Sequence, residues 1–187
     1  GAFLGTELPL TVTQMLWVNL IMDTFAAMAL ASIPPSADVM KEKPRKTSDF
    51  IITKPMRYNI LGVATCFLII LMSLIVYIKG LPLAEVPTAL TAFFTIFVML
   101  QFWNLFNASV FGTNHSVFKD ARHAVGMLSV AIIILIGQII IVEFGGKVFR
   151  TVPLTLTEWI YIIAGTSIVL WVGEIWRWIQ RLKAKKQ

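Results

Sequence analysis

The sequence from Leu16 to Thr24 reads LWVNLIMDT and lies in the middle of an apolar run from Pro9 to Ile33. At about 1.5 Å rise per residue, this run is long enough for a helix across a bilayer, with Asp23 near its midpoint. An acidic side chain at that depth costs about 2.5 to 3.5 kcal/mol, so we expect a compensating partner. Asn19 lies four residues earlier, on the same face of the predicted helix.

The Asn19 and Asp23 side chains allow two interpretations. Amide and carboxylate oxygens are hard donors of the kind that Ca2+ takes, and two of them supply part of its usual set of roughly six to eight. Polar side chains in membrane helices also hydrogen-bond to neighbouring helices and hold a bundle together. The spacing leaves both interpretations open, but an ionisable residue inside a membrane favours a functional hypothesis, here a metal site at Asn19 and Asp23.

The composition is that of a membrane protein. Of the 187 residues, 57% are hydrophobic and 14% are charged, and the mean hydropathy is +0.79. The 16 Lys and Arg outnumber the 10 Asp and Glu, but they lie in loops beside apolar runs. The basic excess therefore indicates contact with a lipid bilayer and not with nucleic acid. The single cysteine, Cys66, excludes a disulfide framework within the chain.

Apolar runs of spanning length occur five times, which predicts an all-α membrane protein, a bundle of five transmembrane helices. Capping boxes begin the first and the last helix, at Thr11–Gln14 and at Thr155–Glu158. We expect residues 1–187 to form one domain. Its predicted helices cover about 10–33, 57–78, 88–111, 124–144 and 156–179, with a polar, cytoplasmic loop at 34–56.

The third predicted helix carries a second group of polar side chains, Gln101, Asn104 and Asn107. Steps of three residues drift around a helix, so the three side chains cannot all face one site. Gln101 is the deepest and is a third candidate for contact with a cation, whereas we expect Asn104 and Asn107 to pack or cap. Glu143, at the end of the fourth predicted helix, is expected to be solvated. The sequence offers no catalytic and no cofactor-binding residue.

Basic residues indicate the orientation in the membrane. With alternating spans, 13 of the 16 Lys and Arg fall on one side, which predicts a cytoplasmic C-terminus. The last predicted helix ends in tryptophans and basic residues, which we interpret as an interfacial anchor. Calmodulin targets share this composition, but the anchor accounts for the same residues, and we expect no calmodulin binding. The chain opens on Gly1 without an initiator Met, so we expect a piece of a longer protein, and its short tail indicates a bacterial cell membrane.

Three segments of the chain resemble the plasma-membrane-type calcium-transporting P-type ATPases. They are VNLIMDT at 18–24 with ASIPP at 31–35, VMLQFWNLFN at 98–107, and EFGGK at 143–147. In order, these segments are similar to that family's sixth membrane helix, its eighth helix, and the turn between its ninth and tenth helices. The resemblance implies that the chain is the C-terminal half of a ten-helix membrane domain, helices six to ten.

The resemblance also implies a function, ATP-driven transport of Ca2+. Carried over residue by residue, Asn19 and Asp23 fall on helix-six ligands, and Gln101 falls where the reticulum-type pump has an acidic ligand. Met22 falls where that pump has a hydroxyl residue. At Gln101 and Met22 the chain differs from the reticulum-type pump, which has two Ca2+ sites, and these two differences imply one Ca2+ per cycle.

Phosphorylation and nucleotide-binding motifs do not occur in the 187 residues. ATP and Mg2+ would therefore be bound only by the parent protein. The partners implied are the lipid bilayer and the remaining helices and cytoplasmic domains of the pump.

Two alternatives stay open at this point. One is a P-type pump for another cation, such as Mn2+ or Na+/K+. The step from Asp23 to Thr24 resembles the plasma-membrane calcium type, while the manganese type typically has Asp-Gly there. The other is a membrane bundle without enzymatic activity, which the sequence upstream of Gly1 would distinguish from a pump.

Overall fold

The computed structural model describes residues 9–33, 52–112, 116–120 and 125–184. Within these residues all regular structure is helical, and five helices are long and apolar enough to cross a membrane. They are Val12–Ala31, Lys54–Lys79, Val86–Ser109, Val125–Phe144 and Leu156–Lys183. The predicted fold class, an all-α bundle of five membrane helices, is confirmed. The predicted loop at 34–56 lies outside the described residues as far as residue 51.

The first span consists of three consecutive helical segments, α1 (Val12–Leu16), the π-helix η2 (Trp17–Met22) and α2 (Asp23–Ala31). It begins at the predicted capping box, in which Gln14 N donates to the Thr11 side chain and Thr11 N donates to Gln14 Oε1 at 2.8 Å. The backbone N–H of Asp23 donates to the carbonyl of Val18, which is the i to i−5 bond of a π turn. The residue pattern predicted a continuous α-helix here and no π turn.

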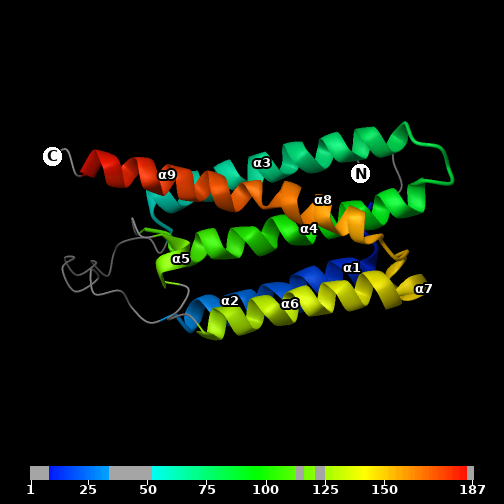
Figure 1. The fold of residues 1–187 in the computed structure, drawn as a ribbon, viewed down its shortest axis with the longest axis horizontal. Coiled ribbons are helices and arrows are strands. Elements are labelled where there is room, and N and C mark those ends of the chain that lie inside the picture. Colours follow the sequence, from blue (N-terminus) through cyan, green and yellow to red (C-terminus); the bar gives the residue numbers. More distant parts are fainter. Residues whose placement is uncertain (1–8, 34–51, 113–115, 121–124, 185–187) are drawn as a thin grey trace.

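The next three spans are uninterrupted α-helices. They are α3 (Lys54–Lys79), α4 (Val86–Ser109) and α6 (Val125–Phe144). Helix α3 begins three residues before the predicted start, because the Thr53 hydroxyl caps it and Pro55 fits its first turn. Two short helices, α5 (Val117–Asp120) and α7 (Gly146–Phe149), lie at opposite ends of the bundle (Figure 1).

The last span is divided into α8 (Leu156–Thr166) and α9 (Ile168–Ala184), where the sequence predicted one helix at 156–179. The break falls at Ser167, whose hydroxyl donates to the carbonyl of Ala164 at 2.7 Å. Leu170 N also donates to Ser167 O with a three-residue step, which tightens the turn. Serine bonds of this kind compete with the helical ladder and bend helices. Helix α8 begins at the second predicted capping box, where Glu158 accepts from Thr155 N at 2.7 Å.

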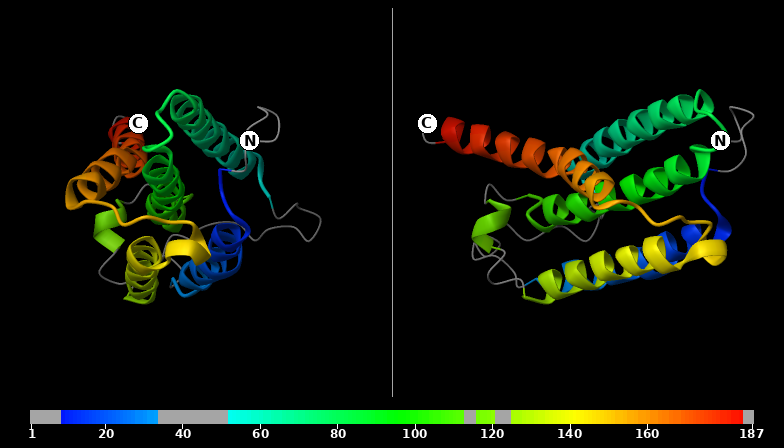
Figure 2. Two further views of the ribbon diagram at one scale, coloured as in Figure 1. Left: turned by 90° about the vertical axis from the view of Figure 1, so that its right-hand side faces the viewer. Right: turned by 45° about the vertical axis from the view of Figure 1, so that its right-hand side comes forward.

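Helix α4 occupies the centre of the bundle. It packs against α3, α6, α8, α9 and the first span, and Figures 1 and 2 show it between α3 and the pair formed by α2 and α6. Three of its side chains, Phe94, Val98 and Met99, form the middle of the core together with Trp17 and Met22 of the first span. Helix α3 buries only Ile75 among its side chains and forms the outer edge of the described bundle.

Candidate cation site

Asn19 and Asp23 lie together on the outward surface of the first span. Their side chains are exposed, whereas Trp17, Val18 and Met22 of the same turns are buried against the bundle. The structure therefore brings the two predicted ligands to one face, near the middle of a membrane-spanning helix. The two side chains are exposed within the described part of the chain.

The π turn accounts for this arrangement. Gln14, Val18 and Met22 follow one another at steps of four residues and are all buried. In an α-helix each such step drifts by about 40°, so the third side chain would leave the packed face. A π turn holds more residues, because its hydrogen bonds run from i to i+5, and it opposes that drift. Asn19 and Asp23 have the same spacing and stay in line beside this buried row, on the exposed side of the span.

The surroundings of Asp23 are apolar. Leu16, Leu20 and Met28 are 53%, 64% and 60% exposed along the same helix. Among the residues that the structure describes, the Asp23 carboxylate has neither a hydrogen-bond nor an ion-pair partner. No three His, Cys, Asp or Glu side chains within these ranges come together as a metal cluster. The arrangement is thus two oxygen donors on one exposed face, fewer than the roughly six to eight that Ca2+ takes.

Gln101 lies on α4, one residue before the buried Phe102. Its side chain is half-buried, and no hydrogen bond in the described part of the chain joins it to Asn19 or Asp23. Phe102 and Met22 belong to the same core cluster, so α4 and the first span are neighbours at this level. The structure therefore groups Asn19 with Asp23 and leaves Gln101 on an adjacent helix.

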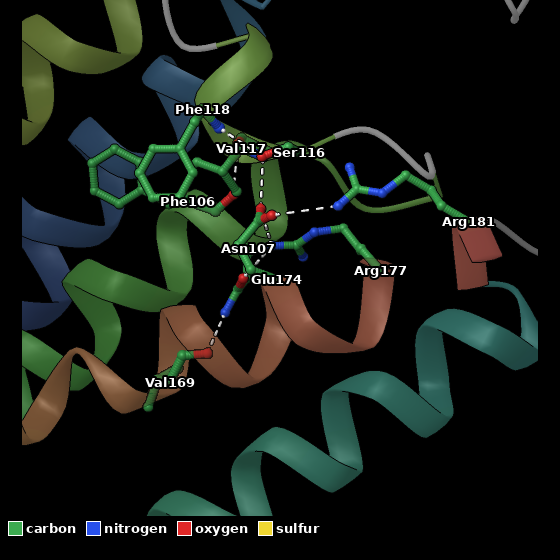
Figure 3. A network of polar contacts seen from close by, with 10 residues as sticks. Phe106, Asn107, Ser116, Val117, Phe118, Val169, Glu174, Arg177 and Arg181 are labelled. Atoms are coloured by element: carbon green, nitrogen blue, oxygen red, sulfur yellow. Dashed lines mark hydrogen bonds and ion pairs between the residues drawn. The ribbon is translucent and has the colours of Figure 1, made fainter. Parts of the chain in front are cut away.

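A second polar group, which the sequence analysis missed, lies at the end of the bundle where α4 and α9 meet (Figure 3). The Glu174 carboxylate, 9% exposed, accepts from Val117 N at 2.7 Å and from Arg177 Nη2 at 2.9 Å. The same Arg177 nitrogen donates to Asn107 Oδ1 at 3.0 Å. Arg181 Nη2 lies 3.9 Å from the other Glu174 oxygen. This network ties α4, α5 and α9 together.

Asn107 packs between helices, as the sequence analysis expected. Its amide nitrogen donates to the carbonyl of Val169 at 2.8 Å, across the approach of α4 to α9. A Cβ at Gly173 would lie 2.7 Å from Asn107 Cγ and 2.9 Å from Nδ2, so only glycine leaves room for the amide. One sequence signal could have revealed the network around Asn107. Glu174 and Arg177 are opposite charges three residues apart inside an apolar helix.

The expectation for Glu143 was wrong. Its carboxylate is half-buried and accepts from Trp159 Nε1 at 3.0 Å and from Leu154 N at 3.4 Å. The backbone between α7 and α8 folds back over the end of α6, where Thr151 donates to the carbonyl of Ile141 at 2.9 Å. Glu143 therefore closes the turn between the last two spans.

Comparisons with known proteins agree with this architecture. Residues 7–179 match the family described as cation transporting ATPase, C-terminus. The plasma membrane calcium-transporting ATPase 4 of Bos taurus is 36% identical over 186 residues, which cover 94% of this chain and 15% of that protein. The calcium-transporting ATPase PAT1 of Dictyostelium discoideum is 37% identical over 180 residues, covering 90% and 16%. The plasma membrane calcium-transporting ATPase 1 of Oryctolagus cuniculus is 34% identical over 200 residues, covering 100% and 16%. The chain spans 15% to 16% of the length of these curated relatives.

Proposed function

Because this chain belongs to the cation-transporting P-type ATPases, as their C-terminal membrane region, we propose that it supplies part of the intramembrane Ca2+ site of an ATP-driven pump. The relatives named above are calcium-transporting ATPases, which supports Ca2+ as the transported ion. Binding of ATP and Mg2+ and the hydrolysis of ATP belong to other parts of such a protein. In this proposal residues 1–187 are one membrane domain that takes no direct part in phosphoryl transfer.

The observation that carries the proposal is the carboxylate of Asp23, which has no partner among the residues that the structure describes. It lies on an apolar surface, and Asn19 presents a second oxygen on the same face. A charged side chain facing lipid at the middle of a span costs about 2.5 to 3.5 kcal/mol. This cost is offset when the face contacts a cation and further helices of the pump. The π turn that carries Asn19 supports the proposal, since such turns are frequent at functional sites.

The site requires ligands from elsewhere in the protein. Ca2+ takes roughly six to eight oxygens, and Asn19 and Asp23 supply two side chains. We propose Gln101 as a further ligand, reached directly or through a water, because α4 packs beside the first span at that level. The remaining oxygens come from helices of the parent pump that cover the exposed face of the first span.

The orientation follows from the distribution of basic residues. The loop at 34–56 and the end of the chain from Arg177 onward carry 10 of the 16 Lys and Arg, so we propose that this end of the bundle faces the cytoplasm. The protein is then a multi-pass component of the cell membrane. The loop at 34–56 lies between the span that carries Asp23 and α3. It is the direct cytoplasmic connection of the site to the rest of the pump.

The test is the substitution Asp23→Asn in the intact protein, reconstituted into sealed vesicles. Asparagine keeps the size of the side chain and removes the charge, so we expect Ca2+-dependent phosphorylation from ATP and Ca2+ uptake to be lost. Ser129→Ala is the matched control, because it removes an exposed hydroxyl that bonds only to its own helix, at Val125 O, 2.9 Å away.

Three outcomes of this test distinguish the alternatives. Normal calcium activation with Asp23→Asn would show that the carboxylate is only a hydrogen-bonding group between helices. Activation of the unaltered protein by Mn2+, or by Na+ and K+, instead of Ca2+ would keep the pump and change its cargo. Phosphorylation independent of every cation tested would remove the transport function.

A further inference from the structure

Helix α6 holds the indole ring of Trp17 from two sides. The Trp17 Nε1–H donates to Gln138 Oε1 at 3.1 Å in the interior of the bundle. The six-membered ring lies against Gly137, where a Cβ would come 3.0 Å from Cζ2 and closer still to Cη2. Contacts this short require one of the two groups to move. Glycine at 137 is therefore the residue that lets the ring occupy this position.

Gln138 makes one hydrogen bond inside the described bundle with its side chain, the bond from Trp17. Its side chain is fully buried, and its Nε2 has no hydrogen-bond partner among the described residues. An unsatisfied buried donor costs free energy, and Leu or Met in place of Gln138 would leave the buried Trp17 Nε1–H without its acceptor. The amide is consistent with a role other than packing, and its one hydrogen bond is the bond to Trp17.

Trp17 is the point at which the first span changes from an α-helix to a π-helix. It is the first residue of η2, and its backbone N–H donates to the carbonyls of Thr13 and Gln14. On the N-terminal side of Trp17, Gln14 Nε2 donates to Phe149 O at 2.8 Å. On its C-terminal side, Ala29 packs against Met127 of α6 in a separate buried cluster. The span is anchored at both ends, and Trp17 lies where the extra residue of the π turn is accommodated.

The register of this turn determines how the two oxygen donors face one another. Asn19 lies inside the π turn, and Asp23 is the first residue after it. Conversion of the turn to a regular α-helix would rotate one side of the span relative to the other by about 100°, the rotation of a single residue. Asn19 and Asp23 would stay on one face, because residues four apart share a face of an α-helix. Asn19 lies within the turn, however, and would shift around the helix axis relative to Asp23, which changes the distance and angle between the two donors.

We propose that Gly137 and Gln138 are positioning residues of the cation site, which act through Trp17. They hold the π turn in the register that presents Asn19 and Asp23 to the same ion. This inference rests on the proposed function and adds that α6, which carries none of the proposed ligands, sets the affinity of the site. The exposed face binds the ion, while the neighbouring, buried face of the same turn controls its geometry.

The test is the concentration of Ca2+ that gives half-maximal phosphorylation from ATP in the intact protein carrying Gly137→Ala or Gln138→Leu. We expect that concentration to rise about tenfold, the equivalent of one lost hydrogen bond, while the maximal level at saturating Ca2+ is kept. Gly165→Ala is the matched control, because a Cβ there meets nothing within 4 Å. A purely structural role would lower the amount of active protein and its maximal level and leave the half-maximal concentration unchanged, which would overturn the inference.

A double-mutant cycle tests whether the effect passes through Trp17. Trp17→Phe removes the ring atoms that Gly137→Ala would strike, so Gly137→Ala should cause no further shift in the Trp17→Phe background. A full additional shift would show that Gly137 acts through another contact and would overturn the inference.

Asp23→Asn separates the two levels of the argument. If Asp23→Asn abolishes calcium activation and Gly137→Ala and Gln138→Leu leave the half-maximal concentration unchanged, the positioning role is wrong and the proposed function stands. If Asp23→Asn leaves calcium activation intact, the proposed function itself fails.

Discussion

Arg177→Met is the substitution that most directly tests how the bundle is held together. The Arg177 guanidinium is 8% exposed and joins two acceptors, Glu174 at 2.9 Å and Asn107 at 3.0 Å. Methionine keeps an unbranched apolar side chain of comparable reach and removes the charge. The substitution leaves the buried Glu174 carboxylate without its nearest cation.

The expected magnitude follows from what remains around Glu174. Removing one partner of a buried ion pair costs about 3 to 5 kcal/mol, because the other charge stays buried without compensation. Val117 N still donates to the carboxylate, and Arg181 still lies 3.9 Å from it. We therefore expect a loss of about 3 kcal/mol, the lower end of that range. The loss should appear first in the segment 116–120, which the network holds against α9.

Hydrogen exchange in detergent-solubilised intact protein measures this loss at the amide of Val117. A loss of about 3 kcal/mol in the free energy of local opening makes exchange faster by about a hundredfold. Lys183→Met is the matched control, because it removes an exposed positive charge from the same helix, and its exchange rate should equal that of the unaltered protein. If exchange in Arg177→Met stays within about threefold of the control, the Glu174–Arg177 pair does not hold this segment, and our account of the network is wrong.

Two further substitutions test local features of the fold. Gly173→Ala places a methyl group against the Asn107 amide, so we expect the free energy of unfolding of the membrane domain to fall by about 1 to 3 kcal/mol in denaturant titrations, while Gly165→Ala leaves it unchanged. Thr155→Ala removes the hydroxyl that caps α8, and we expect a loss of about 1 kcal/mol in the same measurement. Thr157→Ala, in the first turn of the same helix, is its control, and an equal loss in both variants would contradict the cap.

The sequence was sufficient for the features that depend on neighbouring residues along the chain. The five membrane spans follow from the length of apolar runs, and the capping boxes at Thr11 and Thr155 appear where the residue pattern predicted them. The candidate ligands Asn19 and Asp23 were recognised because a polar residue at mid-membrane depth is expensive. Each of these inferences uses only the spacing of residues within one helix.

Contacts between helices were beyond sequence reasoning. Trp17 and Gln138 are 121 residues apart, and Arg177 and Asn107 are 70 apart, yet each pair forms a hydrogen bond. The solvated environment expected for Glu143 was wrong for the same reason, since its partner Trp159 comes from the following span. Such pairs depend on which faces of the helices pack together, which no single run of residues specifies.

The sequence alone therefore determined that this protein is a bundle of membrane helices with a carboxylate and an amide near the middle of its first span. Only the tertiary structure decided which way those groups face, because hydrogen bonds to α6 and α7 fix the rotation of the span that carries them. The local pattern places residues along a helix. The rotation of that helix is set by packing against its neighbours.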